Sequence, residues 1–131
     1  MNIEEIRAYC LSKPLATEDF PFDETTLVFR VHQKIFACID LDDTDWFCLK
    51  CDPDYAIELR DRYSSIKGAW HWNKKYWNQI AQNGDVSDGL LRSLIDHSYE
   101  QVLKKLPRKL REEVLLATQA SDEEQMHTDN L

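Results

Sequence analysis

The stretch that decides the fold is residues 26–51, which read TLVFRVHQKIFACIDLDDTDWFCLKC. Three runs rich in β-branched, aromatic and other apolar residues lie at 26–31, 34–41 and 45–51, and short polar turns separate them. Runs of this kind are typical of β-strands. Apolar side chains fall on both faces of the first two runs. We therefore predict a three-stranded antiparallel meander, with helices covering much of the sheet.

Helices are predicted before and after these strands. The expected ranges are 2–13, 52–63 and 87–106, with a shorter amphipathic helix after Pro107. Each of the three begins at a residue that caps helix N-termini, namely Asn2, Asp52 or Ser87. Glu5 follows Asn2 in a capping-box pattern, and Pro53 suits the first helical position. The third range carries a broad apolar stripe at helical spacing, which should pack across the sheet.

The remaining segments complete the predicted order. Residues 15–25 are expected to form an ordered loop, and residues 70–80 further strand that ends at the turn signal Asn83-Gly84. The order is then α-β-β-β-α-β-β-α-α, an α+β fold with a single antiparallel sheet packed by helices. We expect one domain over residues 1–118. The acidic tail, residues 119–131, lacks core residues and is predicted to be mobile.

Charge is distributed unevenly along the 131 residues. The formal net charge is −8, with −8 in residues 1–61, +6 in residues 62–111 and −6 in residues 112–131. The total suggests a solvated acidic surface, whereas the middle block could form a local basic face. The sequence alone leaves both interpretations open.

Targeting signals and metal sites are not predicted. The N-terminus lacks a basic region followed by an apolar run, and no apolar stretch approaches about 20 residues. We expect a cytoplasmic protein that does not enter a membrane. Cys48 and Cys51 form a lone Cys-x-x-Cys, without a second such pair or a close pair of histidines. The thiols are therefore predicted to be reduced and structural, with no metal or other cofactor.

Catalytic motifs are also missing. The sequence has neither a glycine-rich phosphate loop nor a Gly-x-Ser-x-Gly elbow. The acidic run between residues 40 and 45 lacks the glycine and distal glutamate of a calcium loop, so we interpret it as a solvated hairpin tip. His71 is the most site-like histidine, but no nucleophile adjoins it in sequence. We therefore predict that the protein is not an enzyme.

The segment GAWHWNKKYW, residues 68–77, combines three tryptophans with adjacent lysines. Aromatic faces beside ammonium groups can stack on bases and contact phosphates. A half-buried strand packed in the core would show the same pattern. A second basic run, residues 104–111, could extend a nucleic-acid surface or simply form a solvated helix end.

A series of motifs along the chain resembles the MmcQ/YjbR family of small bacterial proteins. The motifs are EDFPF (18–22), LVF (27–29), KIFA (34–37), LKCDP (49–53), HWNKKYWN (71–78), SY (98–99) and LP (106–107). The resemblance covers residues 1 to about 115. It implies a curved antiparallel sheet similar to secretion-chaperone domains and a "double-wing" DNA-binding arrangement. Trp72 and Tyr76 stand where methionine and histidine are more usual, and they keep the aromatic and basic character of this segment. Ser64 stands where proline is common.

Two functions follow as hypotheses. The first is weak, salt-dependent DNA binding by a basic and aromatic face, whose candidate residues are Lys67, Trp70, His71, Trp72, Asn73, Lys74, Lys75, Lys104, Lys105 and Arg108. The second is a protein-interaction or chaperone-like module, in which the sheet or the aromatic segment receives a peptide or partner. An exposed aromatic patch would favour the second. We expect a monomer in either case.

Overall fold

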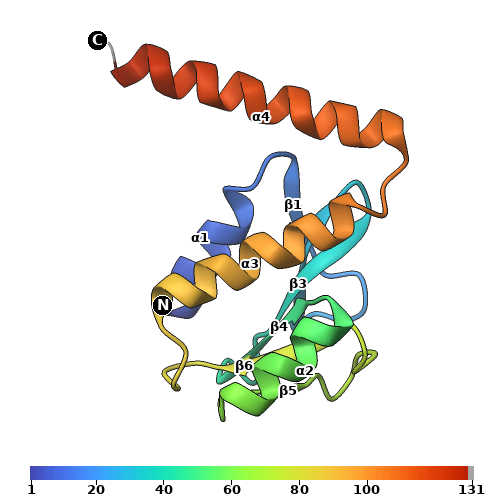
Figure 1. Ribbon diagram of the computed structural model, residues 1–131, viewed down its shortest axis with the longest axis vertical. Coiled ribbons are helices and arrows are strands. Elements are labelled where there is room, and N and C mark those ends of the chain that lie inside the picture. The colour runs from blue at the N-terminus through green and yellow to red at the C-terminus, as the bar shows by residue number, and fades with distance from the viewer. Residues whose placement is uncertain (130–131) are drawn as a thin grey trace.

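A six-stranded antiparallel sheet with the order β1-β2-β3-β4-β6-β5 forms the centre of the molecule (Figure 1). The computed structural model describes the backbone of residues 1–129 and the side chains of residues 1–124. The strands are β1 (Ala16–Asp19), β2 (Thr26–Val31), β3 (Lys34–Asp40), β4 (Trp46–Lys50), β5 (Ile66–Gly68) and β6 (Trp77–Ala81). The helices are α1 (Ile3–Leu11), α2 (Pro53–Arg62), α3 (Asp88–Leu103) and α4 (Arg108–Asp129).

The predicted fold class and the order of its elements are confirmed, and the structure adds strand β1. Residues 16–19 lie in the stretch predicted as a loop, but all four pair with residues 28–31 of β2. Ion pairs fix this edge strand, because Arg7 of α1 binds Glu18 and Arg30 of β2 binds Asp19. The pairing depends on partners distant in sequence, which a local pattern does not reveal.

The prediction of strand over residues 70–76 is wrong. These residues form a loop between β5 and β6, although their aromatic side chains favour strands. Local hydrogen bonds turn the chain instead. The Tyr76 amide donates to the Asn73 carbonyl at 3.1 Å, and the Lys75 amide donates to the Asn73 side chain at 3.0 Å. Strand pairing resumes only at Trp77.

The predicted helix starts are confirmed by their hydrogen bonds. The Asn2 side chain accepts from the Glu5 amide at 2.8 Å, and the Glu5 carboxylate accepts from the Asn2 amide at 3.1 Å. Asp52 caps α2 ahead of its proline, and Ser87 caps α3 by accepting from the Leu90 amide. These caps satisfy amides that the first helical turn leaves without partners.

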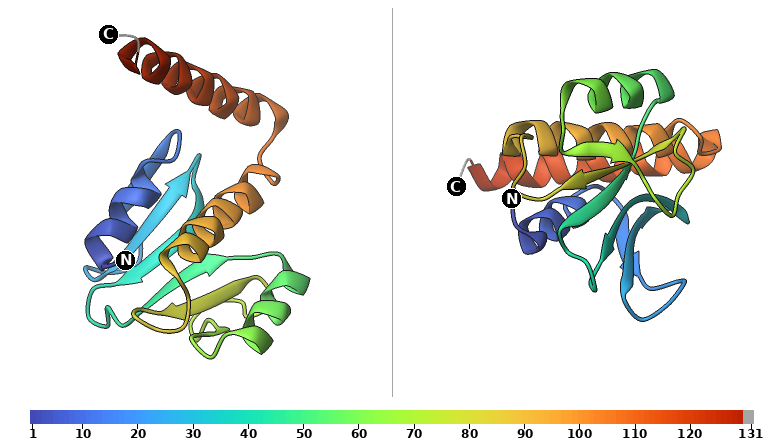
Figure 2. Two further views of the ribbon diagram at one scale, coloured as in Figure 1. Left: turned by 60° about the vertical axis from the view of Figure 1, so that its left-hand side comes forward. Right: turned by 90° about the horizontal axis from the view of Figure 1, so that it is seen from below.

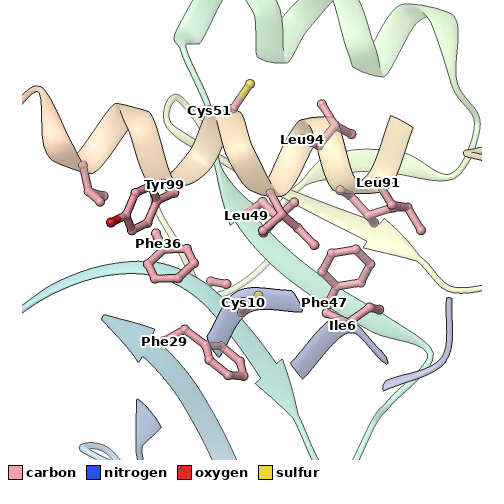
Figure 3. Close-up of a cluster of buried hydrophobic side chains, with 14 of the residues drawn as sticks. Ile6, Cys10, Phe29, Phe36, Phe47, Leu49, Cys51, Leu91, Leu94 and Tyr99 are labelled. Atoms are coloured by element: carbon pink, nitrogen blue, oxygen red, sulfur yellow. The ribbon is translucent and has the colours of Figure 1, made fainter. Parts of the chain in front are cut away.

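One face of the sheet carries the hydrophobic core. Alternate residues of β2 and β4, such as Leu27, Phe29, Phe47 and Leu49, pack against α1, α2 and α3. Figure 3 shows side chains of α3 pointing toward those of the strands. A register shift between Phe29 and Arg30 leaves Phe36 as an extra residue on β3, and its ring packs on Phe29 and Tyr99 in this core.

Ser98 joins α3 to two strands at the centre of this layer. The pairing of β3 with β4 extends to Ala37 and Leu49. At the next position, the Ser98 hydroxyl accepts from the Lys50 amide at 2.9 Å and donates to the Phe36 carbonyl. Ser98 is fully buried. Its hydroxyl therefore replaces a ladder hydrogen bond and fixes the helix on the sheet.

Helix α4 extends into the tail, residues 119–131, that was predicted to be mobile. The helix continues to Asp129, because alanine, glutamine and glutamate in this stretch are strong helix formers. Among the side chains of α4 that the structure describes, Leu110 and Val114 pack on the core. Its later part stands apart from the sheet (Figure 2). Leu115 and Leu116 are exposed. Residues 130–131 of the predicted tail lie outside the described residues.

Replacing Ser98 with alanine should lower the free energy of unfolding by about 1–3 kcal/mol, because it leaves a buried amide and a buried carbonyl without this partner. Chemical denaturation followed by circular dichroism measures the change. Ser93→Ala, at an exposed position of the same helix, is the matched control and should have little effect. Equal stability of the two variants would contradict the bridging role of Ser98.

Candidate functional site

The face of the sheet opposite the helices contains a hollow of about 830 Å³. Its floor comes from the strands, and its walls come from residues 22–26, 40–43 and 70–72. The lining residues are Phe22, Asp23, Thr25, Thr26, Cys38, Asp40, Asp42, Asp43, Trp46, Cys48, Trp70, His71, Trp72 and Gln79. We call this surface the open-face hollow.

Strand register explains the floor. One row of side chains on the same face crosses five neighbouring strands. Each member pairs with the next, in the order Val28, Cys38, Cys48, Gln79 and Lys67. Their chain neighbours point to the helix side. The cysteines and the glutamine of this row line the hollow. Sequence alternation along each strand thus divides the sheet into a packed face and an open one.

Aromatic side chains from two loops meet above the open face. The Trp72 ring lies 4.5 Å from the ring of Trp77, between centroids, and 6.1 Å from the ring of Phe22 in an edge-on contact. Trp77 is buried, whereas Phe22 is 63% exposed and Trp70 is 74% exposed. The loops therefore cover part of this face and leave two large aromatic side chains exposed to solvent at its border.

Arg60 of α2 holds the aromatic loop in place. Its Nε atom donates to the Asn78 Oδ1 atom at 2.6 Å, and its Nη2 atom donates to the Lys74 and Trp77 carbonyls. Three acceptors from the loop and from β6 thus share one guanidinium. The planar group of arginine suits this task, because it offers several donors in a fixed geometry.

Four aspartates give the hollow a negative wall. Asp23, Asp40, Asp42 and Asp43 line it, and among the described residues none of the four forms an ion pair. Hydrogen bonds from the Thr25 and Thr26 amides lower the pKa of Asp23, which keeps its carboxylate charged. The turn between β3 and β4 is solvent-exposed, in agreement with the predicted hairpin tip.

The lysines of the predicted DNA-binding segment lie beside the hollow and pair with aromatic rings. The Nζ atoms of Lys67, Lys74 and Lys75 lie 4.6, 5.5 and 5.4 Å from the ring centroids of Trp46, Trp70 and Tyr76, respectively. These are cation–π distances. The predicted residues Trp70, His71 and Trp72 line the hollow, whereas the three lysines and Asn73 do not.

The second basic group lies at the junction of α3 and α4. Lys104, Lys105 and Arg108 are exposed there, and none of them lines the hollow. Arg108 pairs with Glu112 on its own helix at 3.1 Å. Burial is the largest cause that lowers the pKa of Lys50, and the charges of Lys34 and Lys105 add to this effect. Lys105 therefore belongs to a basic surface with two lysines that the sequence did not single out.

His97 has a structural role. Its Nε2 atom accepts a hydrogen bond from the Asp52 amide at 3.1 Å, at the start of α2. Its ring meets Tyr55 edge-on, with 5.0 Å between centroids. Burial lowers the pKa of His97, which favours the neutral ring needed as an acceptor. This histidine thus fixes α2 against α3.

Sequence reasoning missed most of the hollow. It singled out residues 70–72, but it placed Phe22 and Asp23 in an ordered loop and the aspartates of residues 40–43 in a solvated turn. The cysteines were treated as unrelated to any site. The floor of the hollow could have been found from the alternation of side chains along the predicted strands. Trp46 and Cys48 are two residues apart and face the same side, and Cys38 pairs with Cys48 on the neighbouring strand. The approach of the loops to this face depends on tertiary contacts.

The two thiols on the floor should react slowly in the folded protein. All four cysteines are free, and burial is the largest cause that raises the pKa of Cys38 and Cys48 to about 12. A raised pKa keeps the unreactive thiol form below that pH. Alkylation by iodoacetamide at pH 8, followed by mass spectrometry, should be at least about tenfold slower than in denaturant.

The pH dependence of the alkylation rate distinguishes a raised thiol pKa from steric blocking of the reagent. The rate for the folded protein should still rise above pH 9, where the rate for the unfolded chain levels off because ordinary thiols have a pKa of about 8.5. Equal rates in the folded and denatured protein would contradict the protected state of these thiols.

The described residues include no group of three or more His, Cys, Asp or Glu side chains placed to hold a metal ion. Within the same part of the chain, no helix has the length and apolar character needed to cross a membrane.

Comparisons with known proteins agree with the fold. The YjbR family model matches residues 11–101. The uncharacterised protein YjbR of Escherichia coli K12 is 30% identical over 112 residues, covering 85% of this chain and 95% of that protein. The crystal structure of Deinococcus radiodurans protein DR2400 has a TM-score of 0.80 and 34% identity, covering 86% of this chain and 87% of that one. A Pseudomonas syringae protein has a TM-score of 0.65 and 25% identity, covering 77% of this chain and 98% of that one. The chain therefore belongs to the YjbR family.

Proposed function

We propose that this protein is a binding module without catalytic activity, and that its open-face hollow receives a peptide segment of a partner protein. The observation that carries the proposal is the exposure of Phe22 and Trp70 at the border of a large hollow. Exposed aromatic side chains grouped in this way are typical of interaction sites. Aromatic residues also dominate the binding energy of many protein interfaces.

The size of the hollow supports a ligand larger than a single side chain. Pockets for small molecules have volumes of about 300–1,000 Å³, and the open-face hollow has about 830 Å³. It is also open along the sheet rather than enclosed within the core. An extended segment of a few residues fits such a surface better than a compact metabolite does.

The chemistry of the lining residues supports binding rather than catalysis. Among the histidines whose side chains the structure describes, only His71 lines the hollow, and burial raises the pKa of the two lining thiols to about 12, which makes them poor nucleophiles. A peptide-binding module needs neither a nucleophile nor a base. We propose that it acts as a monomer in the cytoplasm, as expected from the sequence.

Selection from a library of random peptides displayed on phage tests the proposal without assuming a ligand. The selected peptides should bind a Phe22→Ser/Trp70→Ala variant at least about tenfold more weakly, because each truncated aromatic anchor costs about 2 kcal/mol. Isothermal titration calorimetry measures the affinities.

Ile57→Ser is the matched control, since Ile57 is 57% exposed on α2 and lies outside the hollow. It should bind the selected peptides as tightly as the unchanged protein. A selection that returns no peptide would contradict the proposal. Peptides whose binding survives the loss of both aromatic side chains would contradict it as well.

Nucleic-acid binding by the loop of residues 69–76 is a second candidate function. Two observations favour it: Lys74 and Lys75 are exposed, and the exposed Trp70 ring lies beside Lys74. An exposed aromatic ring next to ammonium groups can stack on an unpaired base while the lysines contact phosphates. The aspartates of the hollow oppose this function, because they repel phosphate groups.

This candidate predicts weak binding to a labelled single-stranded oligodeoxynucleotide, mainly at low ionic strength. A Lys74→Glu/Lys75→Glu variant should lose that binding, because it removes about two phosphate contacts and reverses the local charge. Fluorescence polarisation over a salt series measures both effects. An Arg62→Glu/Arg92→Glu variant changes the net charge equally and is the control. Equal loss in the two variants would assign the binding to net charge rather than to the loop.

A further inference from the structure

We infer that the open-face hollow recognises arginine, and that a peptide ligand anchors there through a guanidinium group. This inference rests on the proposed peptide-binding function and names the chemical class of its ligand. It is carried by the combination, in one hollow, of unpaired carboxylates with aromatic rings.

The charge of the hollow selects a cation. Asp23, Asp40, Asp42 and Asp43 line it, and no lysine or arginine does. Among the described ion pairs, none involves these four carboxylates. The four carboxylates are therefore left for a ligand to neutralise, although the ammonium groups of Lys67 and Lys74 lie over the rings of two lining residues, Trp46 and Trp70.

The backbone of the turn between β3 and β4 holds part of this charge in place. The Asp40 carboxylate accepts from the Asp42 amide at 2.9 Å, which fixes its orientation beside the floor of the hollow. Asp23 is held in the same way by the Thr25 and Thr26 amides, at 2.9 and 2.6 Å. Carboxylates with preset positions bind a cation with less loss of conformational entropy.

The aromatic rings favour a planar cation over a compact one. Trp46, Trp70, Trp72 and Phe22 line the same hollow, and the ammonium groups of Lys67 and Lys74 already lie over the rings of Trp46 and Trp70. A guanidinium stacks on such rings and also binds carboxylates through two parallel hydrogen bonds. An ammonium group is more strongly hydrated and offers no planar fork. Arginine therefore uses both kinds of lining residue at once.

The test compares two fluorescein-labelled octapeptides of alternating threonine and arginine or threonine and citrulline. Citrulline has nearly the shape of arginine but carries no charge, so the pair isolates the cation. Fluorescence polarisation at moderate ionic strength should show that the arginine peptide binds at least about tenfold more tightly, because charge-assisted hydrogen bonds are roughly twice as strong as neutral ones.

A variant of the acidic turn locates the effect. Asp40→Asn/Asp42→Asn/Asp43→Asn should weaken binding of the arginine peptide by about tenfold, because each exposed charge pair contributes a factor of a few. Asparagine keeps the Asp40 acceptor for the turn. The control Glu58→Gln/Asp61→Asn/Glu100→Gln makes the same change in net charge on α2 and α3, outside the hollow, and should bind nearly as well as the unchanged protein.

The outcomes separate this inference from the proposed function. Equal binding of the two peptides, lost in both cases on Phe22→Ser/Trp70→Ala, would overturn arginine recognition and leave peptide binding supported. Equal weakening by the two acidic variants would also overturn it, because net charge would then explain the affinity. Failure of the arginine peptide to bind, while phage-selected peptides do bind, would overturn the inference alone.

Discussion

The hydroxyl of Ser98 links α3 to the sheet by hydrogen bonds at the centre of the layer that the hydrophobic core holds together. Ser98 bridges the Phe36 carbonyl and the Lys50 amide at the point where the pairing of β3 with β4 ends. With α3 held there, α1 and α2 pack beside it on the same face. The chain has no other described helix available for the opposite face, since α4 packs on the core through Leu110 and Val114.

The open face is consequently covered by loops rather than by helices. The row of Val28, Cys38 and Cys48 is apolar enough to require cover, and the aromatic rings of two loops provide part of it. Arg60 reaches from α2 to fix one of these loops by hydrogen bonds to its backbone. A loop can leave a hollow where a packed helix would fill it. The hollow is thus a result of helix packing on one side only.

Local sequence patterns were sufficient for the elements whose signals are local. The limits of β2 follow from its apolar alternation, and the helix starts follow from Asn2, Asp52 and Ser87. Residues 70–76 were misassigned because tryptophan and tyrosine favour strands, whereas Asn73 turns the chain through hydrogen bonds that composition does not reveal. The candidate site was only partly predicted, since the meeting of Phe22 with Trp72 joins residues that lie 50 positions apart.

The distribution of tryptophan divides the molecule spectroscopically. All four indoles belong to the open face or its loops, and the core beneath α3 is built from phenylalanine, tyrosine and aliphatic side chains. Intrinsic emission excited at the red edge of the absorption band therefore reports on this face and its loops, including the buried Trp77. Far-ultraviolet dichroism reports mainly on the helices. Movement of the loops and unfolding of the domain can thus be followed as separate signals in unlabelled protein.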